Sequence, residues 1–323
     1  MPRGKRGKPV HGMVLLDKPA GLSSNQALQQ VRRLFDAAKA GHTGNLDPFA
    51  TGMLPLCFGE ATKTAAFMLD ADKSYLATAK LGVSTVTGDT EGETRTQMPL
   101  PKLSQAEAEK VLAGFAGEIQ QVPPMYSALK HEGQALYKLA RQGRVVERQP
   151  RRVTIHEIEL VGWAADEFVF RVRCSKGTYV RTLAEDIAAE MDSCAHLVAL
   201  RRLSVSPFSE RHMVTMETLE ESSKKGILIN HLLALDAGLS GWPSVTLESP
   251  DADRFVHGNP VSLEFAGRGD VRVFGPGEKL LGLGKYQDTE RLEPRRVFNL
   301  EGGLIGRALP ATLPPGAGES IEK

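Results

Sequence analysis

The segment GHTGNLDP over residues 41–48 has the residue types of a reactive loop. Its two glycines free the backbone, and its single carboxylate, Asp47, stands directly before a proline. A carboxylate held on a shaped loop can act as a nucleophile or as a base. The same pattern also occurs in ordinary turns, because an aspartate before proline often supports an Asx turn. Both interpretations stay open from this segment alone.

The segment CSKGTYVRTL over residues 174–183 is a second candidate for chemistry. It has the pattern of a strand end, a glycine turn and a helix start, where backbone N–H groups favour anionic ligands. Arg181 falls in the first helical turn, off the apolar stripe. Its guanidinium has two candidate partners. One is Glu185, in a pair worth about 0.2–0.5 kcal/mol, and the other is a carboxylate from another part of the chain.

Tyr75 and His42 complete the set of candidate side chains. Tyr75 stands in an alternating segment over residues 73–83, and His42 stands in the glycine-rich loop. Taken singly, the tyrosine is a core aromatic of a strand and the histidine a satisfied loop residue. A role for either one depends on the partners that the fold brings to it.

Several common chemistries lack their motifs in this chain. The eight histidines include no HExxH motif, and the three cysteines lie too far apart for a metal knuckle or a disulfide framework. Neither GxGxxG nor GxxxxGKS/T is present to cradle a nucleotide, and no GxSxG elbow occurs. The sequence therefore disfavours a metallohydrolase, a nucleotide-dependent enzyme and a serine hydrolase.

The composition is that of a globular protein. The chain has 323 residues, of which 41% are hydrophobic and 24% charged, which argues against a disordered chain, a coiled coil or a collagen. No apolar run approaches the ~20 residues that span a membrane, and no signal-peptide core follows the basic start MPRGKRGK. We therefore expect a cytoplasmic protein without a membrane segment.

Basic side chains cluster locally although the net charge is only +1. One cluster lies over residues 141–152, and Arg201 and Arg202 form another. Such clusters can follow a phosphate backbone even in a neutral protein, or they can be ordinary solvated surface. They are candidates for holding a nucleic acid.

Strands and helices alternate along the first 240 residues. Apolar runs and period-two alternation predict strands, and a helix of period 3.6 follows the serine pair at residues 23–24. A hairpin is predicted over residues 153–174, with its turn at 162–166. The expected strands are 12–16, 53–58, 73–83 and 197–205, and the expected helices are 24–35, 104–115, 134–142, 178–191, 216–223 and 228–235.

The composition changes at Pro243. Short apolar runs split by glycine and proline follow, without a helical period, which is the pattern of a small β-barrel. We therefore expect four parts: a flexible basic tail over 1–10, a catalytic domain over 11–242, a small β-domain over 243–309 and a disordered tail over 310–323.

Five segments taken together resemble a known family, the bacterial tRNA pseudouridine synthases of the TruB type, which modify uridine 55 in the T-loop. The match covers residues 11–205 in order and spacing, and the β-rich end is similar to the RNA-binding PUA domain often attached to that family. Asn45 departs from the pattern, because the family usually has threonine there. The matching segments are KPAGLSS (18–24), GHTGNLDPFATG (41–52), PPMYSAL (123–129), CSKGTYVRTL (174–183) and LRR (200–202).

The resemblance implies a pseudouridine-synthase fold: α+β, with a mixed, mainly antiparallel sheet flanked by helices, plus a PUA-like β-barrel. It also implies roles for eight residues of this chain. Asp47 would be the nucleophile and Arg181 its ion-pair partner. Tyr75 would stack on the target base and could act as a catalytic base on the sugar. The other five would support them: His42 fills the space of the flipped nucleotide, Tyr179 and Leu200 line the pocket, and Lys18 and Pro19 support the loop.

The reaction implied is the isomerisation of uridine to pseudouridine without a cofactor or a metal. Asp47 would attack the sugar or assist an elimination, and Arg181 is expected to lower its pKa and keep it ionised. The partner would be the T-arm of tRNA, bound by a monomer with no obligate protein partner. One alternative is a tRNA-folding chaperone with secondary or no isomerase activity. Others are a synthase guided by an RNA–protein complex and a glycosidase, for which no second carboxylate is identified.

Overall fold

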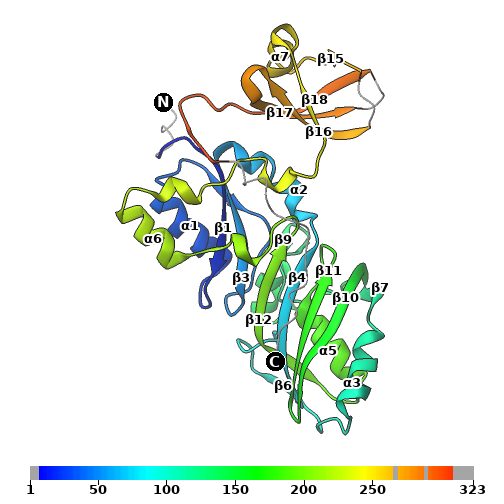
Figure 1. Cartoon of the computed structure of the whole chain (residues 1–323). Helices are drawn as coiled ribbons and strands as arrows, with labels where there is room; N and C mark the ends of the chain where they lie inside the picture. Colours follow the sequence, from blue (N-terminus) through cyan, green and yellow to red (C-terminus); the bar gives the residue numbers. More distant parts are fainter. Residues whose placement is uncertain (1–6, 265–267, 287–289, 308–323) are drawn as a thin grey trace.

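Two sheets of unequal size organise the chain. The structure, a computed structural model, describes residues 7–264, 268–286 and 290–307. A ten-stranded sheet with its helices forms the larger unit, and a five-stranded sheet with one helix lies at one end of the molecule (Figure 1). Of the two expected tails, 1–6 and 310–323 lie outside the described residues. Lys8 and Val10, which were expected in the first tail, are bound to the fold through Asp36 and strand β1.

The large sheet is mixed and mainly antiparallel, as predicted. Its main path runs β13-β1-β3-β12-β4-β11-β10-β7, while β19 pairs with β1 and β2 with β3. Among the described strand pairs of this sheet, only β1 with β13, β1 with β19 and β3 with β12 are parallel. The strands are β1 (Val10–Lys18), β2 (Ala40–His42), β3 (Thr51–Phe58), β4 (Lys73–Leu81), β7 (Gly117–Gln121), β10 (Arg151–Ala164), β11 (Glu167–Cys174), β12 (Ala195–Val205), β13 (Val214–Thr215) and β19 (Leu304–Ile305).

Strands β1 and β3 are buried on both faces, which explains their unbroken apolar runs. Val14 and Leu16 belong to the cluster under the helices, whereas Met13 and Leu15 belong to a second cluster on the other face. The helices that contribute to the first cluster do so because each has an apolar stripe at helical spacing. They are α1 (Ser24–Leu34), α3 (Gln105–Ala113), α5 (Val180–Ala189) and α6 (Met216–Lys224).

Serine caps fix the starts of two of these helices. Ser23 accepts a hydrogen bond from the N–H of Gln26, whose side chain reaches back to Ser23, and Ser104 and Glu107 form the same capping box. Two shorter helices, α2 (Ala65–Leu69) and α4 (Leu136–Arg141), complete the large unit. The predicted helix over 228–235 is wrong beyond a 3₁₀ turn at Leu228–His231, because Leu233 instead exchanges backbone hydrogen bonds with Met13 of β1.

Alternation along β4 and β12 places the candidate side chains on one face of the sheet. Tyr75 lies opposite Arg202, and Ala77 lies opposite Leu200 in the antiparallel pair. Lys73 is two residues before Tyr75 and therefore shares its face. Lys73, Tyr75, Leu200 and Arg202 consequently project together toward the side of the sheet that the helices cover.

The small unit is built on a curled sheet in the order β14-β16-β17-β18-β15. It also contains helix α7 (Ser249–Val256), a correction to the prediction of strands alone in this region. Pro250 in the first turn and the buried pair Ala252 and Phe255 explain the helix. Its strands are β14 (Ser244–Thr246), β15 (Val261–Ser262), β16 (Gly269–Gly275), β17 (Lys279–Tyr286) and β18 (Arg291–Val297).

The large unit also carries two small two-stranded sheets. One pairs β5 (Val83–Thr85) with β6 (Thr94–Gln97), and the other pairs β8 (Lys130–His131) with β9 (Gln134–Ala135).

Polar and aromatic contacts join the two units. Lys63 donates to the carbonyl of Val297 at 2.7 Å, and the Arg295 guanidinium lies 4.9 Å from the centroid of the Phe67 ring. Phe298 is buried in the second apolar cluster with side chains of the large unit. The end of the small unit is therefore anchored on the large sheet, and β19 then pairs with β1.

Candidate active site

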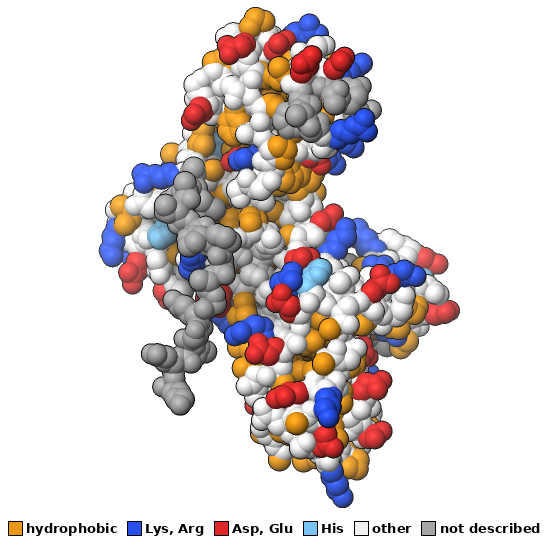
Figure 2. Space-filling view, turned by 45° about the vertical axis from the view of Figure 1, so that its right-hand side comes forward, with side chains coloured by type: hydrophobic (Ala, Val, Ile, Leu, Met, Phe, Trp, Pro, Cys, Tyr) orange, Lys and Arg blue, Asp and Glu red, His pale blue; other side chains and the backbone are white. Residues whose placement is uncertain are grey.

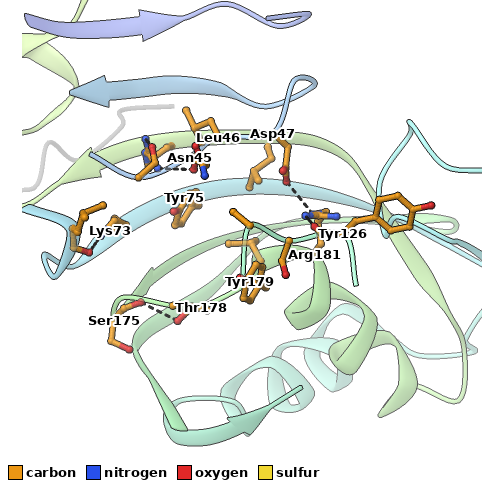
Figure 3. A pocket seen from close by; sticks show the side chains of 18 residues that line it. Asn45, Leu46, Asp47, Lys73, Tyr75, Tyr126, Ser175, Thr178, Tyr179 and Arg181 are labelled. Atoms are coloured by element: carbon orange, nitrogen blue, oxygen red, sulfur yellow. Dashed lines mark hydrogen bonds and ion pairs between the residues drawn. The ribbon is translucent and has the colours of Figure 1, made fainter. Parts of the chain in front are cut away.

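Five of the eight predicted site residues line one cavity of about 270 Å³. Asp47, Tyr75, Tyr179, Arg181 and Leu200 surround it, although they are scattered over more than 150 positions of the chain. Figure 3 shows the side chains of Asp47 and Arg181 meeting at one side of Tyr75. His42, Lys18 and Pro19 do not line this cavity.

The loop that carries Asp47 is pinned at several backbone positions. Ser24 Oγ accepts from the N–H of Leu46 at 2.8 Å and donates to its carbonyl at 3.1 Å. Lys18, which is fully buried, donates from Nζ to the carbonyls of Pro19, Leu22 and Pro48. Residues 18–24 thus hold the Asp47 loop through hydrogen bonds from Lys18 and Ser24, and Lys18 lies where a loop-supporting residue is expected.

Arg181 connects three segments through its guanidinium. Its Nε lies 3.0 Å from Asp47 Oδ2, and its Nη1 lies 3.5 Å from Asp89 Oδ2. It also donates to the carbonyls of Thr87 and Tyr126. Because the side chain is only 6% exposed, these contacts occupy its donors within the fold rather than at the surface. The alternative partner Glu185 pairs instead with Arg95, at 3.1 Å.

The pKa of Asp47 is raised above its ordinary value, in contrast to the prediction. Burial is the largest cause and outweighs Arg181, which lowers the pKa, while the nearby charge of Asp89 raises it further. The Asp47 side chain is 37% exposed, so water in the cavity reaches the carboxylate and weakens the effect of burial. Arg181 therefore opposes burial in setting the charge of the Asp47 carboxylate: it favours the ionised form, whereas burial favours the protonated form.

Tyr75 is 8% exposed and forms one wall of the cavity with its ring. Burial raises the pKa of its hydroxyl, and Arg202 opposes that effect through its charge and a hydrogen bond. A flat aromatic face in a cavity is suited to stacking on a nucleobase.

Tyr179 is held by its backbone at the start of α5. Its N–H donates to Gln121 Oε1 at 2.8 Å, and Gln121 Nε2 donates to its carbonyl at 3.1 Å. Burial raises the pKa of its hydroxyl. The amide of Gln121 therefore fixes the backbone of Tyr179 at the start of α5, two residues before Arg181.

Arg202 and Asp89 are functional candidates that the motifs did not assign. Arg202 was expected among the side chains that hold a nucleic acid, but it is 1% exposed and donates to the carbonyls of Met53, Asn45 and Gly44. Its neighbour Arg201 faces the other way and forms a two-point pair with Asp17. Asp89 is buried beside Arg181 and came from a loop with no signal beyond its polarity.

His42 lies at the end of β2, so the predicted loop begins after it rather than at Gly41. Its Nδ1 is buried without a hydrogen-bond partner among the described residues, and burial lowers its pKa. A neutral ring therefore borders the Asp47 loop at a position outside the lining of the main cavity.

Neither the surface charge nor the metal-ligating side chains of the described residues point to a further ligand. On the face shown in Figure 2, acidic and basic side chains are interspersed. No group of three or more His, Cys, Asp or Glu side chains suited to a metal ion occurs among the described residues. Within the same residues, helices long and apolar enough to cross a bilayer are absent.

This geometry combines a carboxylate, a guanidinium and an aromatic platform in one cavity. The carboxylate is suited to attack or deprotonate a sugar carbon, the arginine to favour its ionised form against the effect of burial, and the ring to hold a planar base. These are the requirements for breaking and remaking a bond between a base and a sugar.

Family comparisons cover most of the chain. Residues 32–180 match the TruB family pseudouridylate synthase N-terminal domain. Residues 181–240 match the tRNA pseudouridylate synthase B C-terminal domain, and residues 243–298 match the Pseudouridine synthase II TruB C-terminal domain.

Curated relatives align over nearly their whole length. The tRNA pseudouridine synthase B of Dechloromonas aromatica is 50% identical over 293 residues, which are 91% of this chain and 97% of that protein. The same-named protein of Nitrosococcus oceani is 47% identical over 301 residues, covering 92% and 98%.

A solved structure supports the fold. A Cbf5–Nop10–Gar1 complex contains a chain with a TM-score of 0.69 and 24% identity, with 92% of this chain and 91% of that chain covered. The predicted α+β fold class is thereby confirmed.

Proposed function

Because the chain belongs to the TruB family of pseudouridylate synthases, we propose that it isomerises uridine 55 in the T-loop of tRNA, with Asp47 as the nucleophile. The observation that carries this proposal is the pair of Asp47 and Arg181 at 3.0 Å, in the cavity where Tyr75 offers its ring. The target uridine leaves its stack and enters this cavity, where stacking on Tyr75 offsets about 1–3 kcal/mol of the cost.

The reaction requires only groups that this cavity supplies. The bond between N1 of uracil and C1′ of the ribose breaks, and its electron pair stays on the uracil ring. Asp47 either bonds to C1′ or assists removal of a proton from C2′. The ring then turns, C5 bonds to C1′, and Asp47 is released or the C2′ proton returns. The proton on C5 departs, and N1 takes up a proton from solvent. Atoms and electrons balance without an oxidant or reductant.

The other predicted residues have matching places in this proposal. Tyr179 and Leu200 border the base, and Lys18 with Pro19 keeps the Asp47 loop in place. His42 stands at the entry of that loop, where a flipped nucleotide leaves space to fill. A monomer acting alone on the T-arm remains our expectation.

A tRNA-folding chaperone is the main competing function. It would need RNA-binding surfaces but no buried ion pair in a cavity, so the Asp47–Arg181 pair favours catalysis. A guided synthase is the other competitor, and activity of the purified protein on bare tRNA separates it from a stand-alone enzyme.

The test uses an unmodified tRNA transcript labelled with tritium at C5 of uridine, mixed with purified protein. We expect release of about one tritium per tRNA, because one C5 proton departs in each turnover. The Asp47→Asn variant should release none while binding tRNA with unchanged affinity. Near-wild-type release by the variant would refute the assignment of the nucleophile. No release by a folded, tRNA-binding wild type would favour the chaperone or the guided enzyme.

A further inference from the structure

Two cations stand together in the cavity, away from the Asp47–Arg181 pair. Lys73 is 8% exposed and Arg202 is 1% exposed, and both contribute to the cavity lining. The Cβ that an alanine would add at Gly44 lies 3.7 Å from Arg202 Nη1 and 3.9 Å from Lys73 Cε, so both side chains converge on this glycine. The catalytic loop, β4 and β12 thus bring two positive charges to one wall.

Neither cation has an acidic partner among the described residues. Lys73 Nζ donates to the carbonyls of Leu69 and Ala71, and Arg202 bonds to three carbonyls and to the neutral hydroxyl of Tyr75. The carboxylates nearest to Lys73 in sequence are engaged elsewhere, Asp70 with Lys176 and Asp72 with His156 and Arg173. Buried like charges without a counter-charge destabilise a fold, which points to a functional reason for keeping them.

Both cations flank the ring on which the base would stack. Arg202 lies directly opposite Tyr75 in the antiparallel pair, and Lys73 lies on the same face of β4, two residues before it. Residues facing each other across strands have Cβ atoms about 4.5–5.5 Å apart, within reach of long side chains. Figure 3 places Lys73 and the Asp47–Arg181 pair on opposite sides of Tyr75.

We propose that Lys73 and Arg202 stabilise the negative charge on the uracil ring after its bond to the sugar breaks. The inference rests on the proposed isomerase function. When the N1–C1′ bond breaks, the electron pair spreads over the ring nitrogens and carbonyl oxygens. Fixed positive charges aimed at such a developing anion lower the barrier, because they need no reorganisation during the reaction. The anion keeps its electrons until C5 bonds to C1′, so both cations also hold it during its turn.

The experiment compares two synthetic T-arm hairpins, one with uridine and one with 5-fluorouridine at the target position. Fluorine withdraws electrons and stabilises the ring anion, so the fluorinated base depends less on help from the protein. The fluorinated base has no C5 proton to lose, so its rearranged product keeps the fluorine on C5. Loss of the starting nucleotide is therefore measured on both hairpins, in single turnovers, by chromatography of nuclease digests.

Lys73→Gln is the leading variant, because its amide still donates to the two carbonyls while losing the charge. We expect it to slow conversion of the uridine hairpin by about 10²–10³-fold, as removal of a preorganised donor does. The loss on the fluorinated hairpin should be several-fold smaller. Arg202→Gln should show the same difference, and if that variant does not fold, Lys73→Gln decides alone.

Arg201→Gln is the matched control. It removes a guanidinium from the same strand, but on the opposite face, where Arg201 pairs with Asp17. Its effect should be equal on both hairpins. Equal losses on both hairpins for Lys73→Gln would overturn the proposal, since a structural or phosphate-binding role slows both alike. A wild type inactive on the uridine hairpin would instead refute the isomerase function itself.

Discussion

Replacing Arg181 with lysine tests whether the shape of the guanidinium matters beyond its charge. The native side chain serves four acceptors with three nitrogens, namely Asp47, Asp89 and the carbonyls of Thr87 and Tyr126. A lysine ammonium has three donors on one atom and cannot span these positions. The variant therefore keeps one positive charge in the site but loses the link to at least one partner.

The size of the effect follows from the bond that is lost. A hydrogen bond to a charged group is worth about 1.5–3 kcal/mol, which corresponds to a slowing of about 10- to 150-fold if it acts on the transition state. Because the Arg181 side chain is 6% exposed, its loss should leave the affinity for tRNA nearly unchanged. We expect kcat to fall by this factor, with little change in the dissociation constant.

The assay is tritium release in single turnovers, with filter binding for the tRNA complex. Arg171→Lys is the control, because that arginine is 54% exposed and makes only a long contact of 3.8 Å to Glu159. It should retain wild-type turnover. Turnover of Arg181→Lys within about threefold of wild type would refute the reasoning, since about 0.6 kcal/mol is below the value of one charged hydrogen bond. A loss confined to tRNA affinity would refute it as well.

Two further predictions concern pH and backbone fit. Burial lowers the pKa of Lys18 and of Lys73 to about 8, so both are protonated below pH 8, and turnover should fall as the pH rises above 8. Between pH 8 and 9 the folded lysines lose their protons while the unfolded lysines keep theirs, so the free energy of unfolding should rise with pH over that window. A fall in the unfolding free energy over the same window would contradict this account. Gly52→Ala should cost about 1–3 kcal/mol in urea unfolding, because φ is +98° and a Cβ would lie 2.3 Å from the carbonyl oxygen of Arg202. Gly241→Ala, which meets open space, is its control, and equal stability of the two variants would contradict this reading.

The strands and the Asp47 loop could be predicted because their sequence signals are local. Alternation identified the strand of Tyr75, and the glycine-rich segment identified the Asp47 loop. Asp89 had no such signal, since its role depends on Arg181, which is 92 positions away and reaches it only in the fold. Helix α7 was missed because a helix of eight residues that includes a proline has too few turns for its apolar periodicity to be recognised.

The burial of charged side chains is the property that was hardest to predict from the sequence. The pair of Arg201 and Arg202 suggested an exposed basic patch, but the pairing with β4 turns Arg202 inward opposite Tyr75. The same gap explains the wrong direction for the pKa of Asp47, where burial exceeds the effect of Arg181. Charge patterns in a sequence give the sign of an interaction but not how far water is excluded from it.

The arrangement of charges across the cavity explains why a base and a sugar would separate there as ions. On one side, Asp47 and Asp89 both lie against Arg181, and the charge of Lys18 also acts on Asp47, so the carboxylates gather there. On the other side of Tyr75, Lys73 and Arg202 leave an excess of positive charge. In the proposed reaction, a nucleotide stacked between them would have its sugar toward the carboxylates and its base toward the cations. As the bond breaks, the sugar carbon would become more positive and the ring more negative, so both walls would stabilise the transition state more than the bound substrate.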